Sequence, residues 1–141
     1  GAPEAHFIAQ CYPHTHSRLL AWVRGLAAQP GAWDRLRVDT LCETIAGNVA
    51  PLLTITDFAQ PAGGVDADPL VGRRAVVLSA RVHPGETNAS WMLEGAVEAL
   101  LGDGPEARAL RRWLVVIVLP SLNPDGVILG NYRCGLSGED L

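Results

Sequence analysis

The sequence predicts an α/β fold in which helices cover a central, largely parallel sheet. Two mainly apolar runs, Arg74 to Ala80 and Trp113 to Leu119, have the length and composition of strands that are buried on both faces. The stretch from Thr87 to Leu101 lies between them and has the length of a helix. A strand, a helix and a second buried strand in this order are typical of a parallel sheet with helical crossovers.

The first predicted element is a helix over Ser17 to Ala28, with Ser17 as its N-cap and Pro30-Gly31 after its end. Its apolar residues recur on one face at helical spacing: Leu19, Trp22, Val23 and Leu26.

Two apolar runs follow, Val38 to Ala46 and Val49 to Thr56. Gly47-Asn48 separates them, and because both residues tolerate positive φ, the runs are predicted to pair as an antiparallel hairpin.

The segment from Asp57 to Gly72 is rich in Pro, Gly, Ala and Asp and has no periodicity, so we expect a surface loop. Thr87 is expected to cap the helix that ends at Leu101. A second short helix is predicted over Pro105 to Arg112, because proline is favoured in the first turn.

Composition excludes several classes of protein. The apolar content of 48% is sufficient for a core, and the net charge of −4 gives no general basic surface for nucleic acid. Cys11, Cys42 and Cys134 are an odd number at wide spacings, which fits neither a disulfide framework nor a CxxC metal site and favours a reducing compartment. No leader and no apolar run near the ~18 residues of a membrane span is present, so we expect a soluble, intracellular protein with no membrane partner.

The chain ends at Leu141 without a cap or a polar tail and is interpreted as a segment of something longer.

The residues best suited to chemistry follow the first buried strand. His83 and Glu86 are three residues apart, and the turn Pro84-Gly85 between them would bring both side chains to one point. Both side chains can ligate zinc, and the carboxyl ends of parallel strands are where α/β proteins place their active sites. The pair supplies two ligands of a site that needs at least three.

Two other groups of polar residues have less specific interpretations. His14-Thr15-His16 would be able to chelate a metal, but a solvated or packed helix entrance explains these residues equally well, and we prefer that interpretation. Asn123-Pro124-Asp125-Gly126 follows the second buried strand and is a strong turn sequence, so a structural role is at least as well supported as substrate contact.

Four blocks in register resemble the cytosolic branch of the zinc metallocarboxypeptidases, from about Cys11 to the end of the chain. They are the block around His83 and Glu86, Pro120 to Val127, Gly130 to Cys134, and Gly138 to Leu141. The resemblance implies a three-layer α/β/α sandwich around a mixed, largely parallel sheet. It also implies that residues 1–141 are the N-terminal portion of the catalytic domain, truncated at the C-terminal end.

The same resemblance assigns roles to particular residues. His83 and Glu86 match the zinc ligands, and Arg133 matches the arginine that stabilises the oxyanion and helps to hold the substrate. Asp140 matches the aspartate that accepts a hydrogen bond from the first zinc histidine. The third ligand, a second histidine, and the glutamate that acts as general base are expected beyond Leu141.

The implied activity is zinc-dependent removal of C-terminal residues from proteins or peptides in the cytosol. The expected substrates are glutamates of polyglutamylated proteins, with tubulin foremost. Two alternatives remain open: a catalytically silent segment that binds or regulates, and an amide hydrolase or deacylase of the wider superfamily.

Overall fold

The computed structural model describes residues 4–61, 63–64 and 68–141, and it confirms an α/β fold with one mixed sheet. The sheet has the order β1-β2-β4-β3. Its strands are β1 (Leu36–Glu43), β2 (Val49–Ile55), β3 (Arg74–Ser79) and β4 (Leu114–Leu119). β1 and β2 form the predicted antiparallel hairpin, β2 is also antiparallel to β4, and β4 runs parallel to β3. The parallel part of the sheet is therefore the β3–β4 pair, whose strands are joined through helices.

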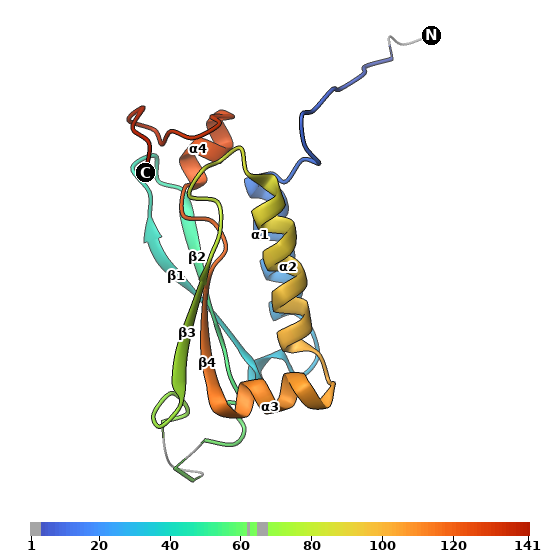
Figure 1. The fold of residues 1–141 in the computed structure, drawn as a ribbon, viewed down its shortest axis with the longest axis vertical. Coiled ribbons are helices and arrows are strands. Elements are labelled where there is room, and N and C mark those ends of the chain that lie inside the picture. The colour runs from blue at the N-terminus through green and yellow to red at the C-terminus, as the bar shows by residue number, and fades with distance from the viewer. Residues whose placement is uncertain (1–3, 62, 65–67) are drawn as a thin grey trace.

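The helices are α1 (His16–Ala27), α2 (Thr87–Leu101), α3 (Pro105–Trp113) and α4 (Pro124–Leu129), with a short 3-10 helix, η1 (Ala32–Asp34). α1 and α2 run along one side of the sheet, α3 crosses one end of it, and α4 lies at the other end (Figure 1). The core lies between the sheet and the two long helices; its fully buried members include Leu53, Ile55, Val97 and Val118. Within the described residues the long helices cover one face, so the second helical layer of the expected sandwich stays a prediction.

Both predicted helix caps were wrong by one or two positions, and the predicted turn begins a helix. Thr15, not Ser17, caps α1, since its side chain accepts from the Arg18 amide at 3.2 Å. Thr87 does not cap α2; Glu86 holds the N-cap position and makes no capping hydrogen bond. The Asn-Pro-Asp-Gly sequence is not an isolated turn, because Asn123 accepts from the Gly126 amide and caps α4.

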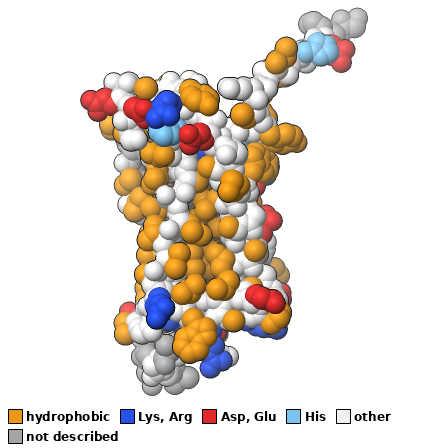
Figure 2. Space-filling model, in the orientation of Figure 1, with side chains coloured by type: hydrophobic (Ala, Val, Ile, Leu, Met, Phe, Trp, Pro, Cys, Tyr) orange, Lys and Arg blue, Asp and Glu red, His pale blue; other side chains and the backbone are white. Residues whose placement is uncertain are grey.

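The burial of β3 also differs from the prediction. β4 borders it on one side, and no second strand pairs with it among the residues that the structure describes. Val77 is consequently 61% exposed, although its strand is as apolar as a central one. Figure 2 shows hydrophobic side chains in a column along the sheet.

The hairpin turn and the loop after it lie where the sequence predicts them, although the first strand has different bounds. The hairpin turns through Gly47 at φ 77°, and β1 ends at Glu43, earlier than predicted. The described part of the segment 57–72 contains no helix or strand, while residues 62 and 65–67 lie outside the described residues. Cys11, Cys42 and Cys134 form no disulfide. Among the described helices, none has the length and hydropathy that crossing a bilayer requires.

Candidate metal centre

The candidate site forms where β3 and β4 end side by side. Because these strands are parallel, the segments after them leave the sheet at the same edge. Backbone hydrogen bonds hold the two segments together beyond the strands: the Leu122 amide donates to Ala80 O at 3.0 Å, and the Asn123 amide donates to Arg81 O at 3.1 Å. In Figure 2, acidic, basic and histidine side chains gather at this end of the molecule, close to the C-terminus.

His83 and Glu86 meet as the sequence predicted. The His83 Nδ1 atom lies 3.0 Å from Glu86 Oε1, and the Glu86 amide donates to His83 O at 3.2 Å, which closes the turn between them. Because the Glu86 side chain makes no capping hydrogen bond to α2, its carboxylate is free to face the imidazole. The two side chains are 19% and 44% exposed, so both remain accessible from solvent.

Asp140 joins this pair to Arg133. One oxygen, Asp140 Oδ1, lies 3.2 Å from His83 Nε2, and the other, Oδ2, accepts from Arg133 Nε at 2.8 Å. A β-bridge between Cys134 and Asp140 brings the two segments together. The hydrogen bond from Arg133 lowers the pKa of Asp140, and the same bond raises the pKa of the Arg133 guanidinium. Both groups are therefore charged at neutral pH, and all four predicted site residues lie in one connected cluster.

The geometry of His83 and Glu86 fits a zinc ion. Ligand atoms at about 2.0–2.2 Å from a tetrahedral zinc stand roughly 3.3–3.5 Å apart, close to the separation of His83 Nδ1 and Glu86 Oε1. A proton on Nε2 that is donated to Asp140 would leave the Nδ1 lone pair free for the metal. The described residues bring no group of three or more His, Cys, Asp or Glu side chains into a metal-binding arrangement, so the site has two candidate ligands here.

Asn123 supports the segment that carries His83, a contact that the sequence did not predict. Its side-chain amide donates to Val82 O at 3.2 Å, next to His83, while its carbonyl oxygen caps α4. The predicted structural role is therefore favoured for this residue. The signal in the sequence was the Asn before Pro124, a helix-start pattern that also fits a turn.

Asp125 also has a structural role, at the β1–β2 hairpin. It accepts from Thr44 Oγ1 at 2.5 Å, from Asn48 Nδ2 at 2.8 Å and from the Ala46 amide at 3.2 Å. Burial acts to raise the pKa of the carboxyl, but the hydrogen bonds from these donors, with a smaller effect of His16, hold the pKa of Asp125 below its ordinary value. The side chain thus fastens the hairpin to α4.

Two glycines allow close packing around the turn that carries the candidate ligands. A Cβ on Gly85 would overlap the ring of Tyr132, and the Gly85 amide donates to Tyr132 O at 2.8 Å. A Cβ on Gly126 would overlap Pro84 in the same turn. The segment that leads to Arg133 therefore lies directly against the turn between His83 and Glu86.

His14 and His16 do not join the cluster. His14 Nε2 pairs with Glu94 Oε1 at 2.7 Å on α2, and His16 is buried, which lowers its pKa despite the opposing effect of Asp125. The alternative in which they complete a zinc site is not supported.

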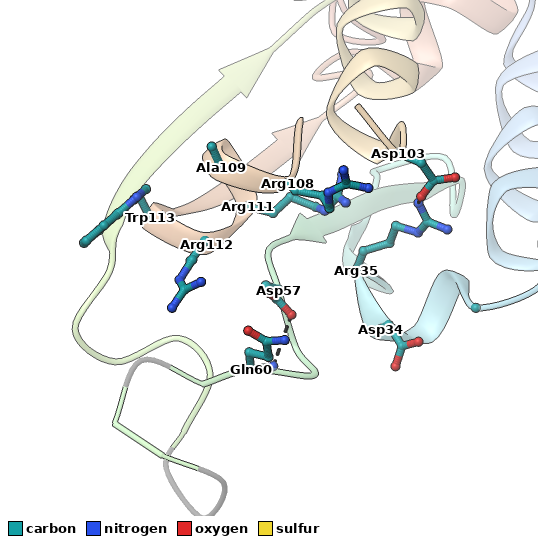
Figure 3. Close-up of a pocket in the computed structure, with 11 residues that line it drawn as sticks. Asp34, Arg35, Asp57, Gln60, Asp103, Arg108, Ala109, Arg111, Arg112 and Trp113 are labelled. Atoms are coloured by element: carbon teal, nitrogen blue, oxygen red, sulfur yellow. Dashed lines mark hydrogen bonds and ion pairs between the residues drawn. The ribbon is translucent and has the colours of Figure 1, made fainter. Parts of the chain in front are cut away.

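Two hollows differ in their relation to the site. One of about 310 Å³ borders it and is lined in part by Pro84, Gly85 and Tyr132. A larger one, of about 560 Å³, lies beneath α3 at the opposite end of the sheet and contains none of the predicted site residues (Figure 3). The larger hollow therefore lies away from the predicted site, and the candidate is based on the titratable cluster at the strand ends and not on volume.

Comparisons with known proteins agree with the predicted resemblance. A family model described as zinc carboxypeptidase matches residues 19–139. The chain is 47% identical over 137 residues to cytosolic carboxypeptidase 2 of Danio rerio, and 46% identical over 135 residues to cytosolic carboxypeptidase 2 of Homo sapiens. These alignments cover 96% of this chain but 18% and 14% of the two relatives, so the chain spans less than a fifth of their length.

Solved structures give the same result for the fold. A metallo-carboxypeptidase from Burkholderia cenocepacia superimposes with a TM-score of 0.75 at 30% identity, over 92% of this chain and 32% of that one. A metallo-carboxypeptidase from Pseudomonas aeruginosa gives a TM-score of 0.70 at 26% identity, over 92% and 31%. The chain thus corresponds to about a third of each of these structures.

Proposed function

The chain belongs to the zinc carboxypeptidase family, and from that premise we propose that it is the N-terminal part of a catalytic domain that removes C-terminal residues from proteins or peptides. The observation that carries the proposal is the approach of His83 Nδ1 to Glu86 Oε1, with Asp140 on the opposite ring nitrogen. A third zinc ligand and a general base are proposed to come from the rest of the polypeptide.

Each residue of the cluster has a distinct proposed task. Zinc, when bound, would supply an activated water at neutral pH. His83 and Glu86 would hold the ion, and Asp140 would keep the imidazole in the tautomer that presents Nδ1. Arg133 would bind the oxygen that becomes negative during peptide hydrolysis, since a guanidinium offers several N–H donors in a fixed plane. Its half-exposed side chain, fixed through Nε by Asp140, supports this role.

We further propose that the residues removed are glutamates, with polyglutamylated tubulin as the first substrate to test and the cytosol as the place of action. The resemblance to the cytosolic branch and the names of the relatives support this choice.

The experiment uses the complete protein that contains this chain. Zinc per polypeptide is measured, and residue release is followed on peptides that end in Glu or Ala, with C-terminally amidated peptides as controls. We expect zinc-dependent release from free carboxyl ends, faster for Glu, and none from the His83→Ala variant. Release of acyl groups from acylated amides instead would favour the deacylase alternative. A protein that binds no zinc and releases nothing would favour the silent segment.

A further inference from the structure

Arg81 is a buried arginine in an unusual backbone conformation, two residues before His83. It is 4% exposed and has φ 58°, and it is the one non-glycine residue with positive φ in the described part of the chain. An L residue with a Cβ rarely adopts the left-handed region unless its surroundings hold it there. The contacts of this side chain identify what holds it.

The guanidinium of Arg81 connects three separate segments. Nε and Nη2 both donate to Pro84 O, at 3.0 and 2.5 Å, inside the turn that carries His83 and Glu86. Nη1 donates to His14 O at 3.1 Å, just before α1, and to Ser90 Oγ at 2.9 Å, in the first turn of α2.

All of these acceptors are uncharged. Burial lowers the pKa of Arg81, but an arginine stays protonated in proteins, so the group is a buried cation held by carbonyl and hydroxyl oxygens. No ion pair of Arg81 occurs within residues 4–61, 63–64 and 68–141. Burying a charge is unfavourable unless hydrogen bonds satisfy it, and here the acceptors that do so lie in three segments, one of them the turn that carries His83 and Glu86.

We infer that Arg81 is a positioning residue: its forked donation to Pro84 O fixes the turn 81–86 and thereby aims His83 and Glu86 at one metal ion before the ion binds. Two N–H donors of one planar guanidinium that converge on the Pro84 oxygen fix both its distance and its direction. Ligands ordered in advance bind a metal more tightly, because less conformational entropy is lost on binding. The inference rests on the proposed function, since it requires His83 and Glu86 to be ligands.

Arg111 provides a matched control for a purely structural arginine. It is also buried, at 6% exposed, and burial also lowers its pKa. Its Nη1 donates to Leu100 O and Gly102 O, carbonyl groups at the end of α2. It lies beside the hollow at the far end of the sheet (Figure 3). Loss of Arg111 should weaken the fold without reaching the ligands.

The test compares Arg81→Lys, Arg81→Gly and Arg111→Lys in the complete protein. Zinc loss to an excess of chelator is timed, and the rise in Tm on adding zinc is measured for each variant. Lysine keeps the charge but lacks the fork, and glycine adopts positive φ freely but lacks the guanidinium. We expect both Arg81 variants to lose zinc about 10-fold faster or more, as is usual when a residue behind the ligands is removed. Arg111→Lys should lower Tm but leave the rate of zinc loss unchanged.

The outcomes separate the inference from the proposed function. If Arg81→Gly loses zinc at the wild-type rate, the backbone conformation sets the ligands without the guanidinium, and the inference is overturned. It is also overturned if Arg111→Lys accelerates zinc loss equally, or if neither Arg81 variant folds. If the wild-type protein takes up zinc and only the Arg81 result fails, the proposed function stands; if the wild type takes up none, both fail.

Discussion

Replacing Asp125 with alanine should strongly destabilise the domain, although this residue does not touch the candidate metal ligands. Asp125 is 6% exposed, and its carboxylate accepts three hydrogen bonds from the hairpin turn 44–48. Hydrogen bonds to ionised groups contribute about 1.5–3 kcal/mol each, but bonds that share one carboxylate do not add fully. We therefore expect Asp125→Ala to lower the free energy of unfolding by about 3–5 kcal/mol.

Urea unfolding followed by tryptophan fluorescence measures this loss. For a urea m-value of about 2 kcal/mol/M, the midpoint should fall by roughly 1.5–2.5 M. Asp39→Ala is the control, because Asp39 is exposed on β1 and its loss should change stability by about 0.5 kcal/mol or less. Asp125→Asn keeps an acceptor oxygen and should fall between the two. Equal midpoints for Asp125→Ala and Asp39→Ala would refute the reasoning.

Changes at the site and its support should have separable effects. Glu86→Gln should weaken zinc binding in equilibrium dialysis, whereas Arg133→Ala should keep its zinc and lower kcat about 10²–10³-fold; the reverse ranking would contradict the assigned roles. Acid should weaken the contact between Asp125 and the hairpin, because the pKa of Asp125 is lower in the folded protein than in the unfolded chain. The contribution of Asp125 to stability is therefore complete above about pH 4 and is lost as the pH falls through the pKa of the folded protein. The urea midpoint should therefore fall more steeply below pH 4 in the wild type than in Asp125→Asn, and parallel curves would contradict this. Gly85→Ala should cost about 1–3 kcal/mol by displacing the Tyr132 ring, and added Tyr132→Ala should restore part of that loss in thermal unfolding; no recovery would show that the ring is not the cause.

The elements with strong periodicity or uniform composition were predictable from the sequence. β4 is a run of apolar β-formers, and α2 begins and ends at the predicted residues. The burial of β3 was not predictable, because it depends on which segments lie beside that strand and not on its own residues. α4 was missed because its first residues, Pro124, Asp125 and Gly126, favour a turn as much as a helix start.

The residues of the candidate site were also predictable only in part. His83 and Glu86 were found from residue types and spacing, while the positions of Arg133 and Asp140 came from the resemblance of whole blocks. The structure brings the four together. Arg81 and Asn123 were missed because they act on backbone carbonyls of Pro84 and Val82, and a contact with a backbone oxygen leaves no pattern in the sequence.

The central claim is that His83 and Glu86 bind one zinc ion. The most direct measurement is an anomalous difference map at the zinc absorption edge from crystals of the complete protein. A single peak about 2.0–2.2 Å from both His83 Nδ1 and Glu86 Oε1 is predicted, with Asp140 still on His83 Nε2. A peak at another site, such as Cys134 or His16, or no peak between these two ligands in zinc-loaded crystals, would contradict the account.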